Sequence, residues 1–265
     1  MMTRMNANAS SLGPAISLRN LSRHYGNIKA VDGVSLNIAA GRLVALVGLS
    51  GSGKSTLLKM INRLVEPTAG EVLIADENVK TVDPHILRRR IGYVFQNIGL
   101  FPHMTIARNI VIGLELAGEK SGRQERVAEL LDLVELPREM ASRMPHQLSG
   151  GQQQRVGVAR ALSTRPRLML MDEPFGALDP VTRDSLVGEY KALHQKLELT
   201  TIIVTHDMAE ALYLADRILV MEGGEIKADA TPAEMLSGNA GEAAEALVAI
   251  PRAQAEHLIA LEKTI

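Results

Sequence analysis

The sequence predicts an α/β fold with a mainly parallel sheet, an antiparallel β subdomain and an inserted α-helical subdomain. Short apolar runs at 42–48, 167–173 and 200–207 have the composition of strands buried on both faces, as in a parallel sheet. Amphipathic helical segments lie between these runs and give the strand–helix–strand order of an α/β core. Residues 103–165 contain helical periodicity without a buried-strand run. They therefore predict the helical insertion.

Length and composition limit the class of protein. The chain has 265 residues, of which 46% are apolar and 22% charged, as expected for a globular protein with a sizeable core. Its formal net charge of −1 provides no general basic field, so we expect no nucleic-acid partner. The absence of cysteine excludes a disulfide framework and a thiolate metal site. No apolar run approaches the roughly 18 residues of a membrane span.

The N-terminal part of the chain predicts a polar lead followed by antiparallel strands. Residues 1–14 lack the apolar centre of a secretory signal, and we expect a disordered lead. Residues 16–26 and 30–41 alternate apolar and polar side chains, which indicates strands. Beyond the apolar run at 42–48, the apolar residues are expected on one helix face: Leu57, Leu58, Ile61, Leu64 and Val65.

The remainder of the chain completes one domain, predicted to span 15–232. Within it, about 100–163 form the helical subdomain, and 217–228 form a hairpin that turns at Gly223 and Gly224. Residues 233–265 predict a short helical extension that is too small for a pair of regulatory domains. A helix between the second and third apolar runs is expected to bury Leu186, Val187, Tyr190, Leu193 and Leu197.

A glycine-rich loop follows the first apolar run and matches the phosphate-loop pattern, in the required setting between a strand and a helix. Glycines let consecutive backbone N–H groups surround phosphate oxygens, and the helix N-terminus adds positive potential. Lys54 is expected to reach the β- and γ-phosphates, and the Ser55 hydroxyl to bind Mg²⁺. The core is thus predicted to be a P-loop NTPase core with a RecA-like sheet. The loop residues are Gly48, Leu49, Ser50, Gly51, Ser52, Gly53, Lys54, Ser55 and Thr56.

Three further side chains stand at the carboxyl ends of predicted strands, where α/β sheets bind ligands. Asp172 and Glu173 end the second apolar run. Asp172 is expected to hold Mg²⁺, and Glu173 to orient and polarise an attacking water. His206 ends the third run and is expected to stabilise charge that develops on a γ-phosphate.

A second glycine pair stands far from the first loop, in "LSGGQQQR" at 148–155. These motifs together resemble the ATP-binding cassette (ABC) ATPases, over about residues 16–232. The resemblance implies that Tyr25 stacks on adenine and that Gln96 senses Mg²⁺ and the attacking water. It further makes 148–152 the signature motif and 168–173 the Walker B strand. The D-loop is 176–179, and His206 is the switch histidine.

The resemblance implies a head-to-tail dimer in which each ATP lies between one subunit's Walker A loop and the other's signature loop. The signature residues Ser149, Gly150, Gly151 and Gln152 then present donors to a γ-phosphate at a helix N-terminus. By the same resemblance, Asp179 is expected to link the two sites near the dimer axis. The implied catalytic residues are Glu173, His206 and Gln96, and the implied Mg²⁺ ligands are Ser55, Gln96 and Asp172.

The sequence that flanks the motifs is similar to that of the ATPases of importers for glycine betaine, choline, carnitine and related quaternary amines. The similar segments are 59–72, 95–110 and 171–186. Arg108 and the missing glycines in 73–79 and before Thr231 depart from that pattern. The implied partners are transmembrane permease subunits and, indirectly, an extracytoplasmic substrate-binding protein. The implied location is the cytoplasmic face of the cell membrane.

Two kinds of alternative remain open. The chain could serve an importer of another small solute, such as a polar amino acid, methionine or phosphate, or, less in keeping with the sequence, an exporter. It could also be a cassette ATPase acting on DNA or in translation. The sequence has no sustained heptad run, which disfavours a DNA-repair or chromosome ATPase with a long coiled coil. It has only one set of motifs, which disfavours a translation factor with two cassettes in one chain.

Overall fold

A six-stranded sheet forms the centre of the protein in a computed structural model, which describes residues 12–262. Its strand order is β10 (Glu225–Ala230), β9 (Arg217–Glu222), β3 (Leu43–Val47), β8 (Thr200–Val204), β7 (Leu168–Asp172) and β6 (Ile91–Val94). All neighbours pair in parallel except β10 with β9, the predicted hairpin. The mainly parallel sheet is therefore confirmed.

An antiparallel sheet covers one side of this core, as predicted. Its order is β2 (Ile28–Ile38), β1 (Ile16–Tyr25), β4 (Ala69–Ile74) and β5 (Glu77–Asn78). Strands β4, β5 and β6 were not among the predicted elements.

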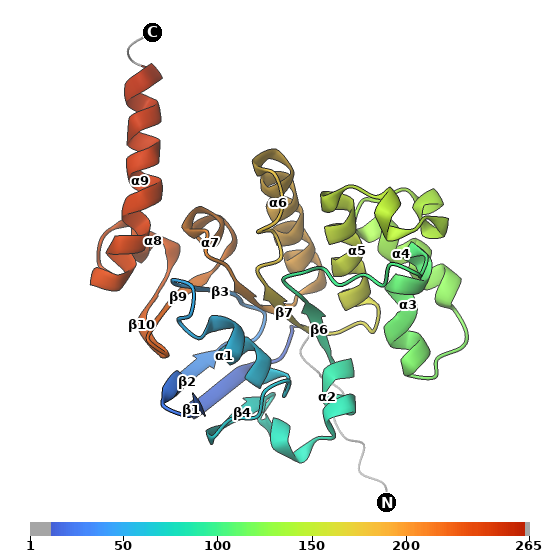
Figure 1. The fold of residues 1–265 in the computed structure, drawn as a ribbon, viewed down its shortest axis with the longest axis horizontal. Helices are drawn as coiled ribbons and strands as arrows, with labels where there is room; N and C mark the ends of the chain where they lie inside the picture. Colours follow the sequence, from blue (N-terminus) through green and yellow to red (C-terminus); the bar gives the residue numbers. More distant parts are fainter. Residues whose placement is uncertain (1–11, 263–265) are drawn as a thin grey trace, which may run out of the picture.

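Helices complete the fold, and Figure 1 shows α3, α4 and α5 gathered together beyond β6 and β7, as the predicted insertion requires. They are α1 (Lys54–Ile61), α2 (Pro84–Arg89), α3 (Ile106–Leu116), α4 (Arg123–Leu133), α5 (Gly150–Leu162), α6 (Pro180–Leu197), α7 (Met208–Leu214), α8 (Pro232–Leu236) and α9 (Glu242–Glu262). Short 3₁₀ turns lie at Val79–Thr81, Arg138–Ser142 and Pro145–Gln147. Helix α9 extends away from the body of the fold (Figure 1). Within the described part of the chain, no helix has the length and apolarity needed to cross a bilayer.

The central sheet is buried on both faces. In β3, Leu43, Ala45 and Val47 belong to one apolar cluster, whereas Val44 and Leu46 belong to the other. Strands β7 and β8 alternate in the same way. The first cluster contains the predicted face of α6, with Leu197 partly buried at its edge. Apolar burial on both faces explains why these strands are continuous apolar runs in the sequence.

Helix α1 ends earlier than its apolar periodicity predicts. Leu57, Leu58 and Ile61 are buried on it, but Leu64 and Val65 lie beyond its end. The N–H of Leu64 donates to the carbonyl of Lys59, and that of Arg63 to the carbonyl of Met60. These two bonds define a Schellman motif, which stops a helix by a left-handed residue at its C′ position.

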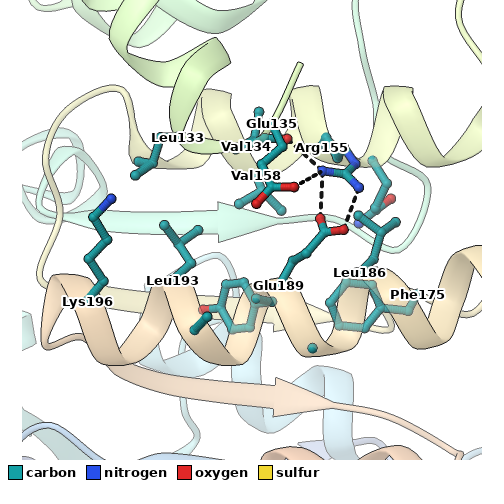
Figure 2. A pocket seen from close by; sticks show the side chains of 14 residues that line it. Leu133, Val134, Glu135, Arg155, Val158, Phe175, Leu186, Glu189, Leu193 and Lys196 are labelled. Atoms are coloured by element: carbon teal, nitrogen blue, oxygen red, sulfur yellow. Dashed lines mark hydrogen bonds and ion pairs between the residues drawn. The ribbon is translucent and has the colours of Figure 1, made fainter. Parts of the chain in front are cut away.

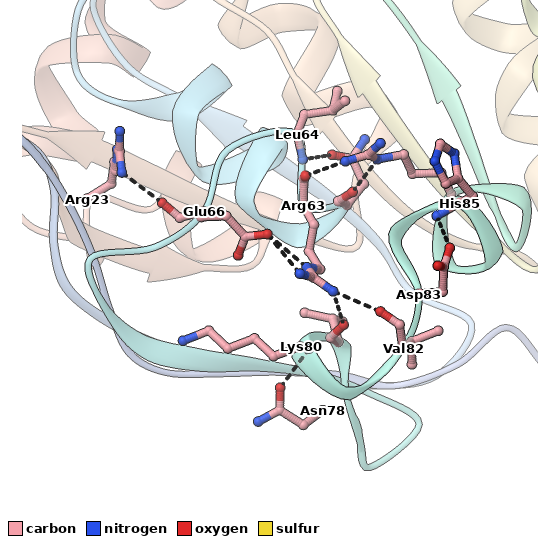
Figure 3. A network of polar contacts seen from close by, with 12 residues as sticks. Arg23, Arg63, Leu64, Glu66, Asn78, Lys80, Val82, Asp83 and His85 are labelled. Carbon is pink, nitrogen blue, oxygen red and sulfur yellow. Dashed lines mark hydrogen bonds and ion pairs between the residues drawn. The ribbon is translucent and has the colours of Figure 1, made fainter.

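Arg63 takes that left-handed position, with φ of 55°, where glycine is the usual residue. Its guanidinium donates to the carbonyl oxygens of Val79 and Val82 and pairs with Glu66 (Figure 3). These contacts offset a backbone cost of about 1–2 kcal/mol and join the end of α1 to the segment that follows β5.

The predicted disordered lead is wrong for residues 12–14, and residues 1–11 lie outside the described part. Gly13 is buried, and its N–H donates to the carbonyl of Glu198 at 2.7 Å. A Cβ on Gly13 would lie 2.2 Å from the backbone nitrogen of Thr200. The chain therefore already contacts the core three residues before β1.

A groove of about 410 Å³ separates the end of α4 and the side of α5 from α6 (Figure 2). Arg155 of α5 crosses it: its guanidinium pairs with Glu189 of α6 at 2.6 Å and donates to the carbonyl of Val134. The helical insertion is thus attached to the core by a partly buried ion pair as well as by apolar packing.

Candidate functional site

The glycine-rich loop at 48–53 connects β3 to α1 and curls around its own lysine. Lys54 is buried, and its ammonium donates to the carbonyl oxygens of Gly48 at 2.8 Å and Leu49 at 2.9 Å. Burial lowers the pKa of Lys54, while the nearby carboxylates of Glu173 and Asp172 oppose that shift. The ammonium also donates to the Ser52 hydroxyl at 3.4 Å. A buried ammonium held only by neutral oxygens is well placed to exchange them for phosphate oxygens.

Two glycines of this loop are required by close backbone approach. A Cβ on Gly48 would lie 2.1 Å from the carbonyl oxygen of Met221, and one on Gly53 would lie 2.0 Å from that of Ala30. Both residues have positive φ. The N–H of Gly224 also donates to the carbonyl of Ser52. The β9–β10 hairpin and β2 therefore hold the loop in its curled shape.

A hydroxyl and a carboxylate meet beside the loop. The Ser55 hydroxyl, at the start of α1, donates to Oδ1 of Asp172 at the end of β7, at 2.8 Å. Both are hard oxygen donors, and Mg²⁺ commonly takes only one or two protein ligands together with water and phosphate oxygens. Ser55 and Asp172 therefore fit a Mg²⁺ ion carried by a nucleotide.

Glu173 lies at the centre of the remaining predicted catalytic residues. Gln96, just beyond β6, donates its amide to Oε2 of Glu173 at 3.0 Å, and Nδ1 of His206 lies 3.3 Å from the same oxygen. The φ of Glu173 is 46°, and its N–H donates to the carbonyl of Val204 in β8. Three strand ends thus bring one carboxylate, one amide and one imidazole together. The sequence places Glu173 and His206 at predicted strand ends, whereas the strand before Gln96 was not predicted. With Oε2 engaged twice, Oε1 is the oxygen available for a water.

Tyr25 is half exposed at the end of β1, as an aromatic platform for a base would be. The guanidinium of Arg23 lies 4.4 Å from the centre of its ring, a cation–π contact that the sequence analysis did not anticipate. Because side chains alternate between the two faces of a strand, residues 23 and 25 lie on the same face. This spacing of two residues could have indicated the contact from the sequence.

The signature segment lies apart from this cluster, at the N-terminus of α5 (Figure 1). Across residues 12–262, no hydrogen bond or ion pair joins 148–152 to 48–56. Ser149 caps α5 by accepting from the N–H of Gln152, whose side chain accepts from the N–H of Ser149. This capping box is visible in the sequence as Ser-x-x-Gln, and the sequence analysis missed it.

The glycine pair also has a local packing role. A Cβ on Gly151 would lie 2.5 Å from Cγ2 of Thr182 at the start of α6, whereas one on Gly150 would meet only ordinary contact with Leu178. Gly151 thus permits the close approach of α5 to α6. Ser149 and Gly150 are exposed. The second, separated glycine motif therefore presents a helix N-terminus to solvent.

Arg183 of α6 is a residue that the sequence analysis missed. Its guanidinium donates to the carbonyl oxygens of Phe175, Gly176 and Leu178, and it pairs with Asp207 at 3.3 Å. The turn between Glu173 and the exposed Asp179, which caps α6, is thereby fixed to the residue after His206. A lone arginine inside a helix gives no sequence signal of such a role.

Glu210 of α7 was also not anticipated. Its side chain is buried, and its Oε1 has no hydrogen-bond partner in the described structure. Burial, with the nearby carboxylate of Asp207, raises the pKa of Glu210 to about 8. The carboxyl group is therefore largely protonated at neutral pH, close to the charged residues around His206.

Comparison with known proteins identifies the family. The model of the ABC transporter family matches residues 31–176, and the chain belongs to this family. It is similar to the choline transport ATP-binding protein OpuBA of Bacillus subtilis (strain 168), with 52% identity over 88% of this chain and 62% of the relative. It is also similar to the glycine betaine uptake system ATP-binding protein YehX of Escherichia coli (strain K12), with 48% identity over 84% of this chain and 72% of the relative. The chain thus spans a little under two thirds of the length of OpuBA.

Solved structures agree with this family and with the predicted fold class. The dimeric structure of the bacterial ABC transporter cassette MJ0796 superposes with a TM-score of 0.73 and 38% identity, over 82% of this chain and 98% of that one. A dimeric post-hydrolysis state of the same cassette, bound to ADP and Pi, has a TM-score of 0.73 and 36% identity over the same shares of the two chains.

Proposed function

We propose that this chain binds and hydrolyses ATP and thereby powers an importer of a quaternary amine osmolyte such as glycine betaine, choline or carnitine. The observation that carries the ATPase proposal is the fixed carboxylate of Glu173, held between Gln96 and His206 beside a curled phosphate loop. The solute is proposed from the functions of the relatives, which transport choline, glycine betaine and carnitine.

In this proposal the phosphate loop binds the nucleotide, and Lys54 exchanges its loop carbonyls for β- and γ-phosphate oxygens. Tyr25 stacks on the base, backed by Arg23. A Mg²⁺ ion held by Ser55 and Asp172, with Gln96 nearby, would neutralise phosphate charge when bound. The free Oε1 of Glu173 accepts a hydrogen bond from the attacking water and orients it towards the γ-phosphorus.

Completion of the site requires a second cassette. Ser149 and Gly150 at the N-terminus of α5 are exposed, and in the described structure 148–152 has no hydrogen bond to the chain's own phosphate loop, so this helix N-terminus is available to a nucleotide held by a partner. We propose a head-to-tail dimer with two shared sites, in which Asp179 lies near the axis. The dimeric cassettes among the similar structures support this arrangement. Transmembrane permeases, with an extracytoplasmic binding protein, would supply the pathway, and the chain would sit on the cytoplasmic membrane face.

The decisive experiment for the ATPase is Glu173→Gln, with Glu222→Gln as the control because Glu222 is an exposed carboxylate at the end of β9. The glutamine variant should bind ATP as the wild type does, lose on the order of 100-fold or more in hydrolysis, and form a dimer with ATP and Mg²⁺ in size-exclusion chromatography. Full hydrolysis by the variant, or a monomer at saturating ATP, would contradict the mechanism.

The solute is tested by uptake. Cells lacking their own osmolyte importers should accumulate labelled choline or glycine betaine only when this chain is co-expressed with its permeases, and not with the Glu173→Gln variant. A second candidate is an importer of another small solute. One observation favours it: a sulfate/thiosulfate import ATP-binding protein of Thermosynechococcus vestitus (strain NIES-2133 / IAM M-273 / BP-1) is 47% identical over 83% of this chain and 65% of the relative. Uptake of labelled sulfate in place of the amines would establish that alternative.

A further inference from the structure

The segment that follows Gln96 is attached to the signature helix by one arginine. Arg160, near the C-terminal end of α5, donates from Nη1 to the carbonyl oxygen of Gly99 at 2.6 Å and from Nη2 to that of Ile98 at 2.5 Å. The same guanidinium therefore binds two consecutive peptide groups, two and three residues after the amide that holds Glu173. Such a forked contact fixes both position and orientation.

A glycine one turn earlier on α5 supports the same attachment. A Cβ on Gly157 would lie 3.0 Å from Cγ2 of Ile98, so the absence of a side chain lets residue 98 lie against the helix. Residues 157 and 160 are three apart and share one face of α5. Two features of one helix face thus meet the same segment independently.

Neutral carbonyl groups are the acceptors that Arg160 has. In the part of the chain that the structure describes, no carboxylate forms an ion pair with it. Arg160 is partly buried, and this burial lowers its pKa. A partly buried guanidinium without a carboxylate partner depends on its hydrogen bonds, so the two peptide groups are not an incidental contact.

Helix α5 connects this contact to the signature residues. Ser149 caps its N-terminus, and Arg160 lies eleven residues further along, about 16 Å at the rise of an α-helix. The far end is fixed to α4 by Arg126, which donates to the carbonyl oxygens of Leu162 and Ser163. The hydrogen-bonded helix between Ser149 and Arg160 is continuous, so displacement of its N-terminus is carried to Arg160 without the Arg126 contact.

We propose that Arg160 is a positioning residue that makes the hydrogen bond of Gln96 to Glu173 follow the position of the signature helix. The inference deepens the proposed ATPase function and rests on it. In a head-to-tail dimer, Ser149 contacts the nucleotide held by the partner, whereas Glu173 acts on the chain's own nucleotide. Arg160 then couples the two sites within one chain: closure at one site sets the catalytic carboxylate of the other.

The test is a double-mutant cycle on the ATPase of the full chain, with Ser149→Ala and Arg160→Met as the single changes. Residues this far apart usually give additive effects, within about twofold in rate. Arg160→Met alone should lower kcat by about fivefold or more while the affinity for a fluorescent ATP analogue stays within about twofold. In the Arg160→Met background the signature helix no longer controls Gln96. The factor by which Ser149→Ala lowers kcat should therefore be at least threefold smaller in this background than in the wild type.

Arg126→Met provides the matched control, since Arg126 is a buried arginine that also binds two consecutive carbonyls at the end of α5 but does not touch the Gln96 segment. It should lower stability and leave kcat per folded molecule near the wild type, with additive behaviour towards Ser149→Ala. Arg160→Lys, which keeps the charge but cannot form the fork, should restore only part of kcat.

Additive effects in the Ser149–Arg160 cycle, or an Arg160→Met variant that loses stability with unchanged kcat, would overturn the proposal. If Arg160→Met does not fold, Gly157→Ala decides. Its new methyl group would lie 3.0 Å from Cγ2 of Ile98 and push that side chain away from α5 by a few tenths of an ångström, while Arg160 remains. We therefore expect kcat to fall with nucleotide affinity retained, and a kcat equal to that of the wild type would overturn the inference. A wild-type chain without ATPase activity would instead refute the proposed function itself.

Discussion

The shape of the phosphate loop can be tested through two of its glycines, because Gly51 and Gly53 differ in what surrounds them. Gly53 has φ of 104°, and a Cβ there would lie 2.0 Å from the carbonyl oxygen of Ala30. Gly51 has φ of 81°, and a Cβ there would meet no described atom within 4 Å. Alanine at each position restricts the unfolded chain equally, so the difference between the two variants reports the folded loop.

The expected magnitudes follow from this geometry. Gly51→Ala should cost only the backbone preference, about 1–2 kcal/mol. Gly53→Ala adds a collision with a backbone carbonyl, which can be relieved only by moving β2 or the loop, and this should add about 2 kcal/mol or more. At about 2–4 °C per kcal/mol for a protein of this size, the two melting temperatures should differ by at least about 4 °C.

Urea unfolding followed by circular dichroism gives the two free energies of unfolding, and titration with a fluorescent ATP analogue gives the two affinities. Gly53→Ala should lose nucleotide affinity along with stability, whereas Gly51→Ala should keep most of its stability. Equal free energies of unfolding for the two variants, within about 0.5 kcal/mol, would show that β2 does not hold the loop and would refute the reasoning.

Two other predictions concern Glu210 and Ser149. The folded protein retains a proton on Glu210 up to about pH 8, whereas the unfolded chain releases it near pH 4.5, so this group makes the free energy of unfolding fall as the pH rises between those values. Glu210→Gln should therefore flatten that fall and stabilise the protein at pH 8, as measured by urea unfolding at several pH values; parallel pH profiles would contradict the buried-acid assignment. Ser149→Ala should cost about 1 kcal/mol of stability through the lost cap and reduce hydrolysis while nucleotide binding to the chain's own loop is retained. In a mixed dimer with one Ser149→Ala subunit, the impaired site should be the one built on the other subunit's Lys54, and impairment of the variant's own site would exclude the shared-site arrangement.

Much of the core was predictable because it depends on local patterns. Strands β3, β7 and β8 are apolar runs buried on both faces, and beside a phosphate-loop motif such runs are typical of parallel strands covered by helices. Strands β4 and β6 were missed because their runs are short and, in β4, interrupted by glycine and glutamate. The end of α1 was misplaced because Arg63 occupies a position where glycine normally marks the end of a helix.

The functional site likewise contains residues that the sequence predicts and residues that it does not. Glu173 and His206 could be assigned because each stands at the end of a predicted strand, and parallel strands bring such ends to one edge. Gln96 follows β6, which was not predicted, so its assignment came from the family resemblance alone. Arg160 and Arg183 could not be assigned, because their role is to bind carbonyl oxygens of loops distant in sequence, and any exposed helix also carries arginines. Sequence patterns thus identify the groups that contact a nucleotide more readily than the groups that hold those residues in place.

In the signature segment, one residue is needed for packing and another is available for a phosphate contact. Gly151 is needed for the approach of Thr182, so the effect of replacing it would not distinguish a packing defect from a lost phosphate contact. Ser149 differs, because its hydroxyl accepts a bond from Gln152 and still has its own proton to donate. The capping box holds that hydroxyl and the first N–H groups of α5 in place before any ligand arrives, which lowers the entropic cost of binding a phosphate. Ser149, rather than the glycine pair, is therefore the residue whose replacement tests whether this exposed helix N-terminus completes a partner's ATP site.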